Sequence, residues 1–135
     1  METTTRLMKR KLVAVALSAS AAEAARVMKK GKTGSVFVGA LPSPDGIFTE
    51  RDLARKVVAE GLDPEKTPVE TVMTRKLVTV DCSEPLEKVF AALARGHFRH
   101  LPITDRGDVV GMISLTDLAA VFRQLAEDEK FLDSY

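Results

Sequence analysis

The chain has little of what several protein classes require. Its 135 residues include one cysteine, one tyrosine, two histidines and no tryptophan. A single cysteine excludes an internal disulfide and a cysteine-rich zinc cluster. With only His97 and His100 available as imidazole ligands, we expect no metal site. We interpret Cys82 as a small, partly buried side chain at the end of a strand, with an intermolecular disulfide as the alternative.

Charge and hydropathy exclude further classes. The formal net charge is +1, and no apolar run approaches the roughly 18 residues that a membrane span needs. The first residues resemble a secretory signal, a basic patch followed by LVAVALSASA. However, the same pattern recurs in mid-chain in TRKLVTVDCSE, so we assign it to the fold and expect a cytoplasmic protein.

Catalytic motifs are also missing. The sequence contains no Gly-x-Ser-x-Gly elbow, no P-loop and no Gly-x-Gly-x-x-Gly. We therefore expect no enzyme. A nucleic-acid-binding protein that uses clustered Lys and Arg is one alternative, but the near-zero net charge and the scarcity of aromatic rings for stacking disfavour it.

What the chain does contain is an internal repeat at a constant offset of 65 residues. Residues 7–54 align with residues 72–119 without a gap. Met8 falls on Met73, Gly46 on Gly111, and Asp52-Leu53-Ala54 on Asp117-Leu118-Ala119. Glycines, apolar positions and an acid that stay in register indicate a tandem duplication.

Each copy predicts the element order β-α-β-β-α. We therefore expect an α/β fold of two tandem repeats packed with pseudo-two-fold symmetry, because a unit of about 50 residues leaves too much apolar surface wet on its own. The expected strands are 12–15, 35–38 and 46–48 in the first copy, and 77–80, 100–103 and 109–113 in the second. The second helix of each copy is expected over about 50–60 and about 115–127.

Capping signals place the first helix of each copy. Ser20 and Glu23 form a candidate capping box. Ser83 is a candidate cap, with Pro85 in the first turn. Gly31 and Gly96 are typical of helix C-termini. The predicted division is repeat 1 at 7–60, a linker at 61–71, repeat 2 at 72–127 and a C-terminal tail at 128–135.

One seven-residue pattern occurs in both copies, as Gly46–Asp52 and Gly111–Asp117. It consists of Gly, two apolar residues, Ser or Thr, any two residues and Asp. It can be a capping box at a strand-to-helix junction. It can also be a ligand site, because a helix start offers free N–H groups to a phosphate and an Asp can accept hydrogen bonds from ribose hydroxyls. One set of residues can do both.

Taken with Val72-Met73-Thr74 and the strand Arg99–Ile103, these segments resemble a tandem CBS-domain pair. The resemblance extends from about residue 7 to about residue 124. It implies a regulatory module that binds AMP, ADP, ATP or a related adenosyl compound such as S-adenosylmethionine in two clefts. It also implies a homodimer that signals to a partner protein, whose identity stays unknown.

The resemblance carries site roles to matching positions. The Asp of each motif would hold the ribose and the Ser or Thr the ribose or phosphate, while adenine would lie against the first strand of the other repeat. Ser114 and Asp117 thus pair with 8–13, and Thr49 and Asp52 pair with 73–78. The candidate nucleotide-binding residues are Arg10, Val13, Thr49, Arg51, Asp52, Arg75, Val78, Arg99, His100, Ser114 and Asp117.

The two copies also differ. The first has Gly34-Ser35 where the second has Arg99-His100, and Pro44 predicts an irregular or edge hairpin. We therefore expect unequal clefts, with Arg51 giving the Asp52 cleft the better phosphate contact. A dimerisation scaffold without ligand is a further alternative. Its candidate faces are Leu53, Val57 and Val58, and Leu118, Val121 and Phe122.

Overall fold

The structure, a computed structural model, describes residues 4–96 and 99–133. Its secondary structure follows the predicted order twice. A short helix, α1 (Thr4–Leu7), precedes both repeats. Repeat 1 contains β1 (Ala14–Val15), α2 (Ala21–Gly31), β2 (Ser35–Val38), β3 (Gly46–Thr49), α3 (Glu50–Asp52) and the π-helix η1 (Leu53–Val58). Repeat 2 contains β4 (Val80–Asp81), α4 (Leu86–Gly96), β5 (His100–Asp105), β6 (Asp108–Ser114) and α5 (Leu115–Asp133), and the 3-10 helix η2 (Val69–Thr71) lies between the repeats.

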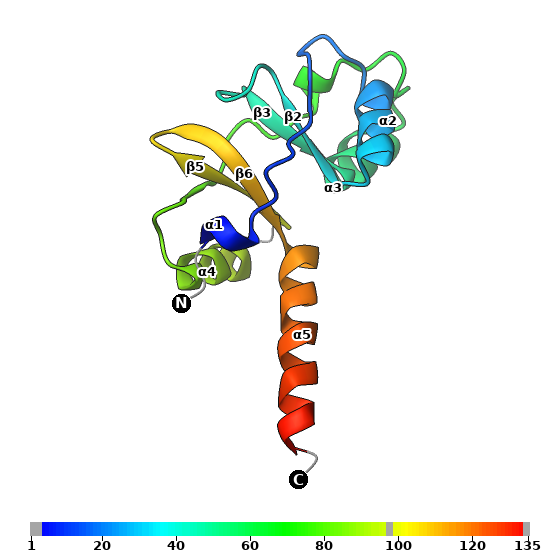
Figure 1. Cartoon of the computed structure of the whole chain (residues 1–135). Coiled ribbons are helices and arrows are strands. Elements are labelled where there is room, and N and C mark those ends of the chain that lie inside the picture. Colours follow the sequence, from blue (N-terminus) through cyan, green and yellow to red (C-terminus); the bar gives the residue numbers. More distant parts are fainter. Residues whose placement is uncertain (1–3, 97–98, 134–135) are drawn as a thin grey trace.

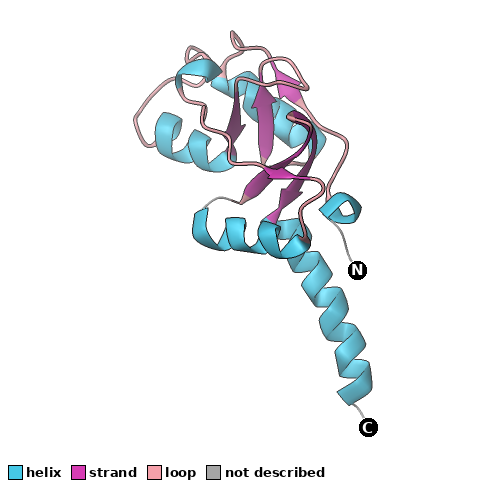
Figure 2. Cartoon of the chain, turned by 90° about the vertical axis from the view of Figure 1, so that its left-hand side faces the viewer, coloured by secondary structure: helices cyan, strands magenta, loops and turns pink. Residues whose placement is uncertain are grey.

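Each repeat folds around a three-stranded sheet, in the orders β1-β2-β3 and β4-β5-β6. In both sheets the first strand pairs parallel with the second, and the second pairs antiparallel with the third. The two sheets lie next to each other in the middle of the molecule with helices outside them (Figure 2). Helix α5 projects away from the body and ends near the C-terminus (Figure 1).

A shared apolar cluster joins the two repeats. Phe37 and Ile47 of repeat 1 pack with Val109 and Met112 of repeat 2, and all four are buried. This contact buries apolar surface that neither repeat can cover alone. The expected α/β pair with pseudo-two-fold symmetry is confirmed.

The segment that leads into each repeat pairs with the sheet of the other repeat. The backbone of Lys9 exchanges two hydrogen bonds with Met112 in β6, at 2.8 and 3.0 Å. At the equivalent place 65 residues on, Thr74 exchanges two with Ile47 in β3, at 2.9 and 2.8 Å. These pairings hold residue 9 against β6, which ends at Ser114, and residue 74 against β3, which ends at Thr49.

Two glycines permit this crossing. A Cβ added to Gly46 would lie 2.7 Å from Met73 Sδ, and one added to Gly111 would collide with Met8. Both methionines are buried. The aligned Gly and Met positions of the repeat are therefore a packing pair, since any larger residue would displace the crossing segment.

Several local predictions are correct. The strand Ser35–Val38 has the expected bounds, and Ser20 caps α2 by accepting a hydrogen bond from the Glu23 N–H at 3.0 Å. Cys82 is half-buried directly after β4. The pairing of β2 with β3 stops at Val38 and Gly46, which leaves the proline-containing segment 39–45 as a loop.

Other local predictions are wrong. The first strand of each repeat is only two residues long, because the preceding residues cross to the other sheet. Helix α4 begins at Leu86, so Ser83 lies three residues before it, with its hydroxyl donating to the Asp81 carboxylate, and Pro85 precedes the helix rather than lying within it. Helices α2 and α4 do end at Gly31 and Gly96 as predicted, but the left-handed residue that follows α2 is Lys32, with φ of 51°.

The last helices also differ from expectation. The helix that begins at Glu50 widens into a π-helix, and α5 continues to Asp133 instead of ending near residue 127. Among the expected dimer faces, Val57 and Leu118 are buried in their own repeats, and Val58 is 65% exposed. The Val121 and Phe122 side chains lie outside the described part. The division into repeats, linker and tail stays a prediction.

Of the helices in the described ranges, none is long and apolar enough to cross a membrane.

Candidate functional site

Two clefts lie between the repeats, and each is built around one of the paired motifs. The Asp117 cleft has a volume of about 580 Å³ and the Asp52 cleft about 530 Å³. Glu50, Arg99 and His100 line both, so they form the wall that the clefts share. The Asp117 cleft is also lined by Lys9, Ala25, Met28, Lys29, Lys32, Thr33, Gly34, Leu53, Met112, Ser114, Thr116 and Asp117. The Asp52 cleft is also lined by Ile47, Thr49, Arg51, Asp52, Arg55 and Thr74.

In the Asp52 cleft, the carboxylate is nearly buried and fully engaged. Thr49 and Asp52 form a complete capping box: the Thr49 hydroxyl accepts from the Asp52 N–H at 3.1 Å, and the Thr49 N–H donates to the carboxylate at 3.1 Å. The Thr74 hydroxyl donates to the same carboxylate at 3.2 Å. Lys56, one turn along the helix, forms an ion pair with it at 2.9 Å.

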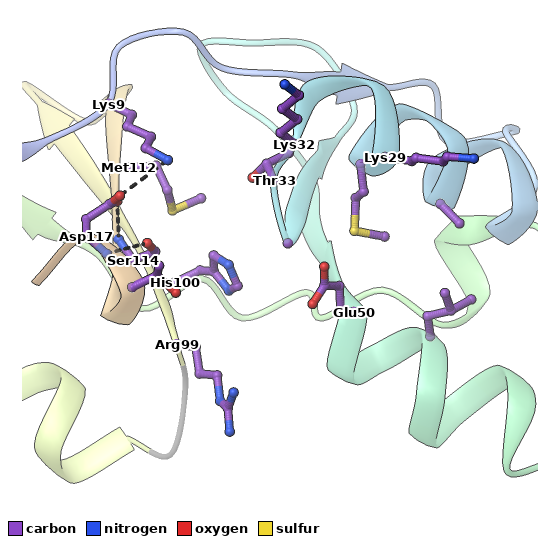
Figure 3. A pocket seen from close by; sticks show the side chains of 15 residues that line it. Lys9, Lys29, Lys32, Thr33, Glu50, Arg99, His100, Met112, Ser114 and Asp117 are labelled. Atoms are coloured by element: carbon purple, nitrogen blue, oxygen red, sulfur yellow. Dashed lines mark hydrogen bonds and ion pairs between the residues drawn. The ribbon is translucent and has the colours of Figure 1, made fainter. Parts of the chain in front are cut away.

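In the Asp117 cleft, the equivalent carboxylate has fewer partners. It accepts from the Ser114 N–H at 3.0 Å, and the Asp117 N–H donates back to the Ser114 hydroxyl at 3.1 Å. Its ion-pair partner is Lys9, at 3.3 Å (Figure 3). The Asp117 side chain is 18% exposed, compared with 9% for Asp52. Its carboxylate is therefore the more accessible of the two.

The shared wall brings charged groups of both repeats together. His100 begins β5 and pairs with Ser114 across the strand register. Burial lowers the pKa of the His100 imidazole, and the carboxylates of Glu50 and Asp117 oppose this by raising it. An imidazole held neutral in this way can gain a proton when a further anion comes close.

Arg10 and Val13 line a smaller cavity of about 300 Å³. This cavity shares Lys9, Lys32 and Met112 with the Asp117 cleft, so the two spaces adjoin. The two residues expected opposite Asp117 therefore do lie beside its cleft.

Arg75 and Val78 are not brought to the Asp52 cleft in the same way. The Arg75 guanidinium donates to the Glu70 carbonyl at 3.1 Å, and Val78 is 44% exposed. Neither lines that cleft. The other candidates do line a cleft: Thr49, Arg51, Asp52, Arg99, His100, Ser114 and Asp117.

Sequence reasoning missed four groups that complete the clefts. Lys9 and Thr74 lie in the segments 8–13 and 73–78 that the resemblance places opposite the motifs, but it does not identify them as partners of the motif carboxylates. Lys56 lies four residues after Asp52 on one helix, a spacing that itself predicts an ion pair. Glu50 is one of the two unspecified residues of the motif Gly46–Asp52, and the pattern does not predict that it lines both clefts.

No cluster of three or more potential metal ligands occurs within the part of the chain that the structure describes. The groups present suit another chemistry. A helix start with a hydroxyl, a carboxylate and nearby cations is suited to an anionic ligand that also carries hydroxyl groups.

Tandem β-α-β-β-α repeats that cross-pair and enclose two clefts define a class of paired α/β modules. The chain belongs to the CBS-domain family: the sequence model of the CBS domain matches it twice, at residues 5–59 and 69–124. The resemblance noted from the paired motifs is confirmed.

Two relatives illustrate the range of chain lengths. The chain is 37% identical over 97 residues to the CBS domain-containing protein YhcV of Bacillus subtilis, covering 72% of this chain and 69% of YhcV. It is 39% identical over 71 residues to the CBS domain-containing protein CBSCBSPB2 of Arabidopsis thaliana. That match spans 53% of this chain but only 13% of the plant protein.

Solved structures share the fold over almost the whole chain. An uncharacterized conserved protein from Pyrococcus horikoshii superimposes with a TM-score of 0.84 at 33% identity, covering 91% of this chain and 96% of the other. The CBS domain protein PAE2072 from Pyrobaculum aerophilum, solved in complex with AMP, gives 0.80 at 27% identity, covering 93% and 99%. A hexameric CBS-CP12 protein from bloom-forming cyanobacteria gives 0.79 at 29%, covering 88% and 70%.

Proposed function

We propose that this chain is a regulatory module that binds an adenine nucleotide, AMP, ADP or ATP, in its two clefts and catalyses no reaction. The observation that carries the proposal is the repeated helix-start motif. In each cleft a hydroxyl residue and an aspartate at the start of a helix face the leading segment of the other repeat. Such a site offers N–H groups to phosphate and a carboxylate to ribose.

The AMP complex of PAE2072 supports the choice of ligand, because that protein matches nearly the full length of this chain. The cleft volumes are also adequate, since ligand sites commonly span about 300–1,000 Å³. In this proposal Asp117 and Ser114 hold ribose and phosphate in one cleft, with Arg10 and Val13 beside the base. Asp52, Thr49 and Arg51 act in the other.

Arg99 and His100 would serve either cleft, because both line the shared wall. On the base side of the Asp52 cleft, Arg75 and Val78 stay candidates that would have to move to make contact. The exposed Val58 marks one surface that a second copy could cover, and we propose a homodimer. The output is a partner protein that senses the occupied state.

Isothermal titration calorimetry with AMP, ADP, ATP and S-adenosylmethionine tests the proposal. We expect a dissociation constant on the order of micromolar for at least one nucleotide, which corresponds to about 8 kcal/mol. The double variant Asp52→Ala/Asp117→Ala should bind none of them, whereas Asp105→Ala, an exposed acid at the end of β5, should bind as the wild type does.

Two further readouts separate the alternatives. Phosphate release during long incubation with ATP should be absent, and release abolished by the double variant would contradict the non-enzyme assignment. A single-stranded oligonucleotide should not raise the melting temperature, whereas the bound nucleotide should. Stabilisation by the oligonucleotide alone would favour a nucleic-acid-binding protein, and light scattering of a monomer would contradict the dimer.

A further inference from the structure

The wall shared by the clefts contains a carboxylate and an imidazole that converge on one glycine. Glu50 begins α3 in repeat 1, and His100 begins β5 in repeat 2. A Cβ placed on Gly34 would lie 3.0 Å from His100 Nε2 and 3.3 Å from Glu50 Cδ. Both side chains therefore reach the same small space, and in Figure 3 they lie between the Asp117 side of the cleft and α3.

The position of Glu50 is fixed by the fold. Its backbone N–H donates to the Gly34 carbonyl at 3.0 Å, which joins the start of α3 to the segment before β2. None of the ion pairs between described residues involves Glu50. Its negative charge consequently acts on both clefts from one fixed place.

The position of Glu50 along the ligand path follows from the proposed function, on which this inference rests. With ribose at Asp117 and the first phosphate at Ser114 and the start of α5, further phosphates extend toward the shared wall. There they approach Glu50, and like charges at short range repel. In Figure 3 the side chains of Lys29 and Lys32 point away from His100, and the side chain of Arg99, the cation of the shared wall, points away from Glu50.

We propose that Glu50 is a specificity-determining residue whose carboxylate makes the Asp117 cleft prefer adenine nucleotides with one phosphate over those with three. A single phosphate stops short of Glu50 and faces the His100 side of the wall. Each added phosphate brings more negative charge toward the carboxylate. The chain itself supplies a neutral counterpart, because the residue equivalent to Glu50 in repeat 2 is Leu115.

The test compares AMP and ATP binding to the full chain by calorimetry in the wild type, Glu50→Gln and Glu50→Leu. We expect the wild type to bind AMP more tightly. Both variants should bind ATP about tenfold more tightly than the wild type does, with less than about threefold change for AMP. Glu50→Leu installs a residue that already begins the equivalent helix, which guards against a folding failure of one variant.

The matched control is Glu23→Gln, which removes an exposed carboxylate from the first turn of α2, outside both clefts. It should leave the ratio of AMP to ATP affinity unchanged. A wild type that binds ATP as tightly as AMP would overturn the inference while leaving the proposed function intact. The same holds if the ratio does not change in either Glu50 variant, or if it changes equally in Glu23→Gln. If the wild type binds neither nucleotide, both proposals fall.

Discussion

The two clefts contain the same seven-residue pattern, but the aspartate carboxylate of each has different hydrogen-bond and ion-pair partners within the protein. Asp52 is held by Thr49, Thr74 and Lys56, whereas Asp117 is held by Ser114 and by a longer ion pair to Lys9. Two substitutions between the copies cause this difference: position 74 is Thr where position 9 is Lys, and position 56 is Lys where position 121 is Val.

A repeated motif therefore does not imply a repeated role. A carboxylate whose partners are protein groups contributes to stability, and a ligand must compete with those partners for it. A more exposed carboxylate with fewer partners is better prepared for a ligand. We expect Asp52 to matter more for folding and Asp117 more for binding ribose.

The largest expected effect concerns stability. Asp52→Ala removes a capping box, the Thr74 hydrogen bond and the Lys56 ion pair at a nearly buried site. It should lower the free energy of unfolding by about 3 kcal/mol. Asp117→Ala removes the carboxylate half of the equivalent capping box and the longer Lys9 ion pair at a more exposed site, and it should cost about 1 kcal/mol. Urea denaturation without nucleotide measures both, and equal losses would erase the distinction between the two aspartates.

The second effect concerns nucleotide affinity. Asp117→Ala should weaken AMP binding at the tighter site by about 30-fold, or about 2 kcal/mol, because the ribose hydroxyls lose their acceptor. Asp52→Ala should weaken that site by less than about threefold. Calorimetric titration of each variant with AMP distinguishes them. If Asp52→Ala abolishes the tighter site, the ranking of ribose sites is reversed.

A third effect sharpens the comparison on the phosphate side. Arg51 lines the Asp52 cleft, and its counterpart in the Asp117 cleft is Thr116. Arg51→Thr should weaken AMP binding in the Asp52 cleft about tenfold, because a guanidinium matches the geometry of phosphate. Thr116→Arg is the reciprocal variant and should strengthen the other cleft. A change of less than about twofold at Arg51 would show that the ribose side alone sets the difference.

The smallest expected effect is a pH dependence of the free energy of unfolding, which arises from His100 in the shared wall. Burial lowers the pKa of His100 below its ordinary value of 6.5. The positive charges of Arg99 and Lys9 lower it further, whereas the carboxylates of Glu50 and Asp117 raise it. As the pH falls below about 6.5, the unfolded chain gains the proton first, so the free energy of unfolding decreases.

Denaturation curves between about pH 7.5 and 5 measure this dependence. His100→Gln should have the shallower slope over that range, since glutamine does not titrate. Ser35 occupies the equivalent position in repeat 1, so no matching contribution arises there. Identical slopes in the variant and the wild type would assign the dependence to other groups.

Sequence reasoning recovers the repeat, the element order and the motif residues, because these follow from local patterns. The caps at Thr49 and Ser114, and the strand Ser35–Val38, need only periodicity and helix-start chemistry. The partners of the motif carboxylates are different. Lys9 reaches Asp117 across 108 positions of sequence, and nothing local predicts which sheet its segment joins.

The remaining errors have a similar origin. The π-helix at Leu53–Val58 and the extension of α5 to Asp133 depend on how each helix packs or projects, which residue propensities decide only weakly. The meeting of Glu50 with His100 needs the docking of one repeat on the other. Lys56 is the exception, because its spacing from Asp52 was available from the sequence.

The crossing of residues 9 and 74 between the sheets has a consequence for ancestry. The segment leading into each copy pairs with the third strand of the other copy, the edge strand of that sheet, at Lys9 with Met112 and at Thr74 with Ile47. A single ancestral copy with this architecture would have had to exchange leaders with a second molecule. Fusion of the two genes would then have kept, within one chain, a contact that two separate copies already made. By the same logic, a chain cut within 61–68 should reassemble from its halves, because each half carries the segment that pairs with the edge strand of the other.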